Sequence, residues 1–179
     1  MLQIIAIAAG AAIAGVLGIA ATRPNTFRVQ RAAAINAPPD AIYPLIADFR
    51  AWNGWSPWEK LEPGMDKTFS GADSGTGAVY AWEGKKVGSG RMEITDTAAP
   101  SRITIKLDFF KPWEAHNTTT FTLEPRGGAT QVTWTMEGPA PFISKLMGVV
   151  MNMDRLIGRD FESGLASLKQ LAEGQAAAR

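Results

Sequence analysis

Few residues in this chain could perform catalysis. The sequence has one histidine, His116, and no cysteine, which excludes disulfides, thiolate metal sites and a cysteine nucleophile. A zinc site with several imidazole ligands lacks those ligands, and a Ser-His-Asp triad has only this one imidazole to use. Neither Gly-x-Ser-x-Gly nor His-Glu-x-x-His occurs, so the usual hydrolase and zinc-protease motifs are absent. We therefore predict no metal site and no cofactor.

Charge and glycine patterns also argue against nucleic-acid and nucleotide binding. The formal net charge is +1 and the pI is about 8.0, whereas proteins that bind polyanions are usually strongly basic. Residues 71–77 read GADSGTG. They lack the Lys-Ser/Thr ending of a phosphate-binding loop and precede a strand instead of a helix. We predict neither nucleic acid nor nucleotide as a partner.

The most unusual stretch is rich in tryptophan, since residues 52–58 read WNGWSPW. Indole faces bind flat apolar rings and cations well, so Trp55 and Trp58 could stack on a ligand. They could equally pack in the core and close one end of a curved sheet. The sequence leaves both interpretations open.

Strand alternation predicts which other side chains face the interior. Trp134 and Met136 share a row with Val132, and Asn117 and Thr119 share a row with Phe121. A polar side chain there could orient a ligand hydroxyl or carboxylate, and methionine adapts to variable apolar ligands. The predicted ligand-binding residues are Trp55, Trp58, Tyr80, Trp82, Met92, Phe109, Asn117, Thr119, Trp134, Met136, Met147 and Met151.

Two charged or titratable residues have simpler interpretations. Arg31 falls in the inward row of the first strand, where a charge is costly unless it is paired. A bulge near the end of the strand, or pairing with a neighbouring acid, is therefore favoured over a ligand contact. The same alternation predicts that His116 faces solvent.

Periodicity predicts the elements that must position these residues. Residues 27–36 alternate as a first strand, and the segment 38–49 begins with prolines and continues with a helical apolar stripe. A second short helical element should follow in the tryptophan-rich stretch. Six further strands are separated by turn signals at 71–77, 100–101 and 126–128. Residues 141–173 then predict one long helix, unless Gly148 or Gly158 breaks it.

This order predicts an α+β protein whose antiparallel meander carries one long helix across it. A single helix cannot fill the concave side of a strongly curved sheet. We therefore expect a hollow there, closed at one end by the two short helices.

The N-terminal segment has a separate role. Residues 2–22 contain no charged residue, and about 20 apolar residues in a helix span roughly 30 Å, the thickness of a bilayer core. We predict a transmembrane anchor at 1–22 and a domain at 23–179. Arg23, Arg28 and Arg31 follow directly and favour the cytoplasmic side. The alternative is a secretory signal peptide, which would release a secreted or periplasmic protein; no Lys or Arg precedes the apolar run, which argues against it.

Four stretches carry a resemblance to a known family, and they span roughly residues 26–173. They are INAPPDAIYPLIADFRAWNGWSPW, SGADSGTGAVYAWEG, SRITIKLDF and DFESGLASLKQLAE. The chain resembles the START-like superfamily (SRPBCC, the birch-pollen-allergen fold), and within it the polyketide cyclase/dehydrase and lipid-transport group. The resemblance implies a helix-grip fold: a curved antiparallel sheet of about seven strands around a long C-terminal helix, with two short helices after the first strand. It also implies a central apolar cavity.

Three functions fit these observations. The first is binding or carriage of a hydrophobic small molecule, such as a lipid, isoprenoid or polyketide-like compound, at the membrane. The alternative is a polyketide cyclase/dehydrase-type enzyme, for which the resemblance offers Tyr80 as a general acid. The third is a protein-interaction module that uses the tryptophan-rich stretch as its partner surface.

Overall fold

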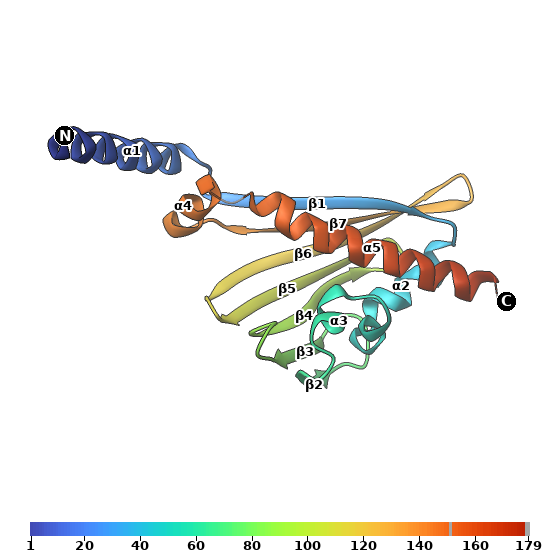
Figure 1. The fold of residues 1–179 in the computed structure, drawn as a ribbon. Coiled ribbons are helices and arrows are strands. Elements are labelled where there is room, and N and C mark those ends of the chain that lie inside the picture. The colour runs from blue at the N-terminus through green and yellow to red at the C-terminus, as the bar shows by residue number, and fades with distance from the viewer. Residues whose placement is uncertain (151, 178–179) are drawn as a thin grey trace.

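The structure is a computed structural model that describes residues 1–150 and 152–177 (Figure 1). Its helices are α1 (Leu2–Thr22), α2 (Pro39–Ala47), α3 (Pro57–Leu61), α4 (Phe142–Val150) and α5 (Met153–Ala177), with a 3-10 helix η1 (Phe49–Gly54). Its strands are β1 (Thr26–Ile35), β2 (Asp66–Gly71), β3 (Ala78–Glu83), β4 (Ser89–Ala98), β5 (Arg102–Lys111), β6 (Ala115–Arg126) and β7 (Ala129–Pro139).

The seven strands form one antiparallel sheet in the order β1-β7-β6-β5-β4-β3-β2. Strands β2 to β7 follow one another as a meander, and β1 joins the far side by pairing with β7. Val29 lies opposite Met136, and Arg31 lies opposite Trp134. Alternate residues along β7 are buried, as expected for a sheet with one covered face. The predicted α+β class and the antiparallel sheet of about seven strands are confirmed.

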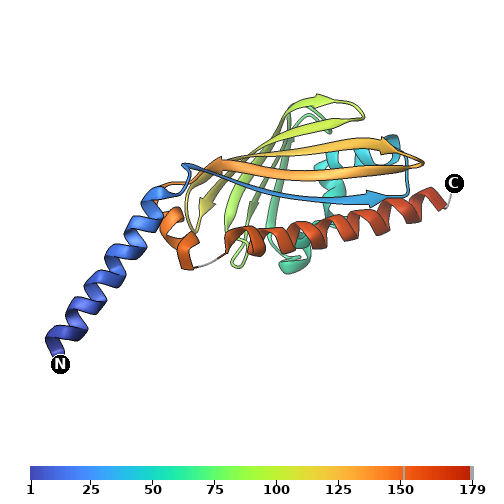
Figure 2. The same ribbon diagram turned by 90° about the horizontal axis from the view of Figure 1, so that it is seen from above.

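Helix α5 covers the inner face of the curved sheet. It runs along the length of β1, with α2 and α3 on the same face towards its C-terminal end (Figures 1 and 2). Pro39 begins α2, where a missing N–H is harmless. Ile42 and Ile46 of α2 and Leu165 and Leu168 of α5 are fully buried. This is the helix-grip arrangement, and its core lies between α5 and the sheet.

The C-terminal helix is interrupted, and neither predicted breaking point is responsible. Helix α4 ends at Val150, Asn152 is not helical, and α5 begins at Met153. The side chain of Asn152 accepts a hydrogen bond from the backbone N–H of Arg155 at 2.9 Å, and its carbonyl accepts one from Leu156 at 3.1 Å. Asn152 is thus the N-cap that starts α5. The prediction of one helix over 141–173 is wrong because the apolar stripe continues across this cap.

Residues 2–22 form a helix, α1, that extends away from the domain and contacts α4 (Figure 1). Within the part of the chain that the structure describes, no helix has both the length and the hydropathy needed to cross a bilayer. The predicted helix is therefore present, but its prediction as a transmembrane helix has no support from the structure.

Candidate functional site

The tryptophan-rich segment packs inside the molecule. Trp52 and Trp55 are both buried. The indole Nε1 of Trp52 donates to the carbonyl of Ile46 at 3.0 Å, and that of Trp55 donates to the carbonyl of Leu45 at 2.9 Å. These carbonyls lie at the end of α2, where a helix leaves carbonyl groups without intrahelical partners. The two indoles cap α2 and close one end of the interior, so the segment is not an exposed partner surface.

Trp58 and Trp134 meet beneath α5. The ring of Trp134 stacks on Phe161 with centroids 4.1 Å apart, and the half-buried ring of Trp58 meets it edge-on at 5.8 Å. Gly164 makes room for this stack, because a Cβ there would lie 2.8 Å from the Trp134 ring. The Nε1 of Trp134 is buried and has no hydrogen-bond partner among the described residues. Buried donors usually have one.

The inner face of the sheet is sealed at one end and open at the other. Ile105 and Phe121, in the middle of the sheet, are 0% exposed, whereas Met92, Asn117 and Met136 retain 6–8% exposure. Beyond these three, the inward-facing apolar residues are only partly buried. We call this region, near α4, the open end of the interior; its partly buried residues are Phe27, Trp82, Phe109 and Ile157.

Asn117 is the most informative polar residue at the open end. It pairs with Leu107 of β5, which in turn pairs with Met92 of β4. Its Oδ1 is buried and has no hydrogen-bond partner among the described residues. Gly138 on the neighbouring strand leaves the space that this oxygen occupies, since a Cβ there would overlap it. Such an acceptor in an apolar wall could accept a hydrogen bond from a ligand hydroxyl or ammonium group. The next inward residue of β6, Thr119, is also buried.

The two best-formed hollows among the described residues do not lie beneath α5. A hollow of about 290 Å³ lies between α1 and α4, and one of about 600 Å³ lies on the outer face of the sheet. The first is lined by Ile13, Val16, Leu17 and Leu146. The second is lined by residues of β1, β6 and β7, among them Arg28, His116 and Glu137. Large rings, among them Trp55, Trp134 and Phe161, pack against one another under α5 and occupy space that the curvature leaves.

Tyr80 belongs to a buried polar cluster that the sequence did not reveal. Its hydroxyl donates to Glu59 at 2.7 Å, and Glu59 also forms an ion pair with Lys67. Burial, together with the adjacent Glu59 carboxylate, raises the pKa of Tyr80 far above its usual value. The phenol therefore keeps its proton and directs it at Glu59, which leaves Tyr80 poorly suited to act as a general acid. Glu59 lies in α3 within WEK, a pattern that gives no sign of burial.

Two of the predicted methionines are not placed at the interior. Met147 lies on α4 and is exposed. Met151 lies outside the described residues. Met147 is predicted as part of one long C-terminal helix, whereas α4, which carries it, is separate from α5.

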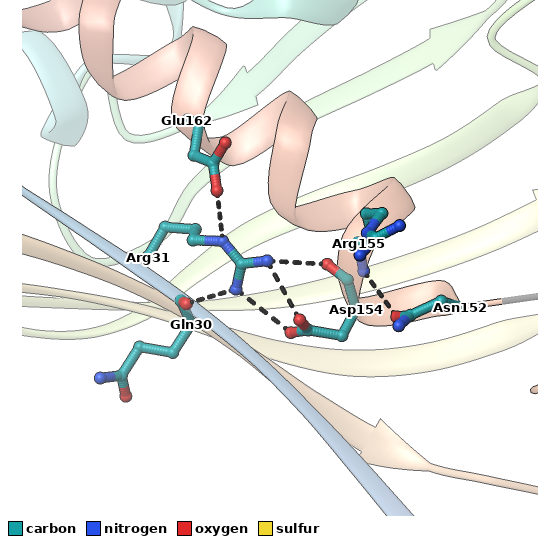
Figure 3. Close-up of polar contacts among 6 residues, drawn as sticks. All are labelled: Gln30, Arg31, Asn152, Asp154, Arg155 and Glu162. Atoms are coloured by element: carbon teal, nitrogen blue, oxygen red, sulfur yellow. Dashed lines mark hydrogen bonds and ion pairs between the residues drawn. The ribbon is translucent and has the colours of Figure 1, made fainter.

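Arg31 links β1 to α5 as its predicted pairing with an acid requires (Figure 3). Its Nε donates to Glu162 at 2.7 Å, and its Nη atoms bind both carboxylate oxygens of Asp154 at 3.1 and 3.2 Å. The carbonyls of Gln30 and Asp154 accept further hydrogen bonds from it. Gly158 leaves the room for the guanidinium, which a Cβ would overlap. These contacts engage the guanidinium with the protein rather than with a ligand.

His116 is exposed, as predicted, but it is also paired. Its Nδ1 lies 2.7 Å from Asp108 and its Nε2 lies 3.2 Å from Glu114. The bond to Asp108 raises the pKa of His116 despite an opposing effect of desolvation. Burial alone would raise the pKa of Asp108, but hydrogen bonds from His116 and Lys106 bring it below its usual value.

Solved structures with the same fold have low sequence identity to this chain. A protein, CV1439, from Chromobacterium violaceum is 20% identical with a TM-score of 0.60, covering 84% of this chain and 99% of that one. Protein Ms6760 from Mycobacterium smegmatis is 20% identical with a TM-score of 0.56, covering 85% and 92%. Ara h 8.0201 is 9% identical with a TM-score of 0.57, covering 83% and 99%. At these identities the likeness establishes the fold.

The family assignment comes from the sequence. No curated protein matches this chain. Residues 26–173 match the family model described as polyketide cyclase / dehydrase and lipid transport. The matched region begins with β1 and ends within α5, so it takes in the whole sheet and the helix that covers it. The START-like resemblance is thereby confirmed, and the chain belongs to the polyketide cyclase/dehydrase and lipid transport family.

Proposed function

We propose that this protein binds a hydrophobic small molecule, such as a lipid, isoprenoid or polyketide-like compound, at the open end of its interior. The observation that carries the proposal is the unpaired buried Oδ1 of Asn117, which lies over Gly138 of β7 on a strand that pairs Asn117 with Leu107. Leaving a buried acceptor without a donor costs about 1–3 kcal/mol. An apolar molecule with one hydroxyl would remove that cost by donating to Asn117.

Binding would displace side chains instead of filling a ready-made cavity. Met92 and Met136 are unbranched and adapt easily to a new neighbour. Phe27, Trp82 and Phe109 already keep part of their surface in contact with solvent. Covering that apolar surface would contribute about 25 cal/mol per Å². Family membership supports a hydrophobic small molecule as the ligand. The place of Asn117 in the interior wall of this protein supports the position of the ligand's hydroxyl group.

Tethering at a membrane completes the proposal. The uncharged residues 2–22 would hold the domain near a source of hydrophobic ligand, and Arg23, Arg28 and Arg31 favour the cytoplasmic side. Intact protein recovered from membranes should then have the full mass of 19.2 kDa. A species that lacks the first 20 or so residues would instead indicate a cleaved signal peptide.

The enzyme alternative gains no comparable support. The one residue suggested for acid chemistry, Tyr80, donates a hydrogen bond to Glu59 and has a raised pKa. We therefore propose binding without assigning a reaction.

Replacing Asn117 by leucine tests the proposal, because ligand binding and folding should respond in opposite directions. Asn117→Leu should raise the free energy of unfolding of the ligand-free protein by about 1–3 kcal/mol, since it removes an unpaired buried acceptor. Native mass spectrometry should show fewer copies of this variant carrying a co-purified hydrophobic molecule. Thr118→Val changes the next, outward-facing residue of β6 and serves as the matched control. An Asn117→Leu protein that is destabilised, yet retains the wild-type adduct, would assign Asn117 to the structure alone.

A further inference from the structure

Exposed hydrophobic side chains gather at one end of the molecule. Apart from Leu61, every large hydrophobic residue that is exposed among the described residues belongs to one of three segments: residues 1–19, α4 with the first turn of α5, or the end of β5 with the turn after it. Trp113 in that turn is 72% exposed, and Ile143 and Phe142 of α4 are 62% and 49% exposed. Exposed apolar patches usually mark an interaction surface.

These segments lie at the same end of the strands in the sheet. β7 ends just before α4, and the start of β1 pairs with that end at Thr26 and Pro139. β6 also begins at this end, because Thr118 pairs with Glu137. The turn from β5 to β6 therefore lies at this end of the sheet. Figure 1 shows α4, the last turn of α1 and the β5–β6 turn on one side of the molecule. The open end of the interior lies at the same end of the strands.

The same end carries positive charges without acidic partners. Arg23, Lys145, Arg155 and Arg159 form no ion pair among the described residues. Several nearby acids are already engaged: Glu114 with His116, Glu137 with Arg28, and Asp154 with Arg31. Asp160, beside Arg159, is in no ion pair among the described residues and is partly buried. No Asp or Glu occurs before Asp40 or between residues 138 and 153. The charge of this end therefore complements an anionic surface.

We propose that α4 and the β5–β6 turn form a docking face for the surface of an anionic lipid bilayer. The docking face consists of Phe110, Trp113, Phe142, Ile143 and Met147. Short helices with an apolar face and flanking cations lie in the plane of the lipid headgroups, and tryptophan is enriched at that depth. Lys145 and Arg23 would contact lipid phosphates, while Ile143 and Trp113 enter the boundary of the acyl chains.

Docking would place the open end of the interior against the bilayer. A hydrophobic ligand could then pass between membrane and protein without crossing water. This consequence rests on the proposed function, whereas the docking itself does not require any ligand. Failure of one is therefore distinguishable from failure of the other.

The absence of cysteine allows a direct test with the full chain. Ile143→Cys and Trp113→Cys each provide one labelling site on the docking face, and Ser74→Cys provides a control in the exposed loop between β2 and β3. That loop lies at the opposite end of the strands of the antiparallel sheet. Each variant would carry a nitrobenzoxadiazole label and be reconstituted in phosphatidylcholine vesicles, with or without phosphatidylglycerol. Lipids with a nitroxide near the headgroup would quench any label at the surface.

Labels at residues 113 and 143 should be quenched several-fold more than the label at 74. The difference should grow with phosphatidylglycerol and shrink when Arg23 and Lys145 are both changed to glutamine. Because α1 is retained in every variant, quenching reports the orientation of the domain. Equal quenching at all three sites would overturn the proposal. So would labels at 113 and 143 that are buried between two copies of the protein in lipid-free detergent solution.

Discussion

At the scale of single residues, the buried hydrogen bond between Tyr80 and Glu59 gives a clear expectation for stability. Tyr80→Phe removes the donor and leaves a buried carboxylate with Lys67 as its remaining partner. We expect the free energy of unfolding to fall by about 1–3 kcal/mol in urea titrations. Tyr43→Phe is the matched control, since Tyr43 is the other tyrosine of the chain and is only partly buried; its effect should stay within about 0.5 kcal/mol. Equal effects of the two changes would contradict this account.

His116 should make stability depend on pH. Its pKa is raised in the folded protein by the bond to Asp108, so folding favours the protonated ring. The stabilisation is complete below the ordinary histidine pKa of about 6.5 and is lost as the pH rises through the raised pKa. We expect unfolding experiments to show declining stability across this interval in the wild type, and a flatter profile in His116→Gln.

Because the chain has one histidine, its ring protons can be followed by NMR without ambiguity. Asp108 should make stability depend on pH in the acidic range as well. Its pKa is lowered overall in the folded protein, so its contribution to stability is present above the ordinary carboxyl pKa and is lost as the pH falls through the lowered pKa. A His116 resonance that titrates at or below the ordinary histidine pKa would rule out the pairing.

At the scale of elements, the seam between β1 and α5 depends on one arginine and one glycine. Arg31 reaches Asp154 and Glu162 across α5 because Gly158 leaves the helix surface open. The contact fixes the first half of α5, next to the open end of the interior. A small side chain at position 158 should therefore loosen this half of the helix.

Gly158→Ala tests this seam against helix propensity. Alanine favours a helix over glycine by about 1 kcal/mol, so Gly174→Ala, with open space around it near the end of α5, should be neutral or stabilising. Gly158→Ala should be destabilising relative to Gly174→Ala because it displaces the guanidinium of Arg31. Hydrogen exchange should accelerate in the first turns of α5 in that variant only. Equal stabilisation by both changes would mean that the seam contributes little.

At the scale of the whole molecule, the two ends of the interior have different roles. The end near α2 is sealed by Trp52 and Trp55, whose indoles also cap that helix. The end near α4 retains partly exposed aromatic residues, an unpaired amide oxygen at Asn117, and the helix α1 that leads away from the domain. The end near α2 is closed by buried side chains. Ligand exchange is proposed for the end near α4.

Local patterns accounted for most of the fold but for little of the site. Strand alternation and proline-started helices depend on neighbouring residues, so the strand order and the inward row containing Asn117 could be predicted. The break at Asn152 could not, because an apolar stripe on both sides hides a single capping side chain. The partners of Arg31 lie 123 and 131 residues away along the chain. Whether Trp134 and Phe161 fill the interior depends on side-chain volumes in three dimensions, which periodicity does not contain.

The most direct test of the central claim is methyl NMR of the methionines during titration of the full chain with geraniol, an isoprenoid alcohol with one hydroxyl. Met92 and Met136 line the open end, whereas Met65 is buried beside Tyr80 and Met147 is exposed on α4. We predict saturable shifts of the Met92 and Met136 methyl signals, reduced in Asn117→Leu, with Met65 unchanged. Shifts confined to Met147, or none that saturate, would contradict the account.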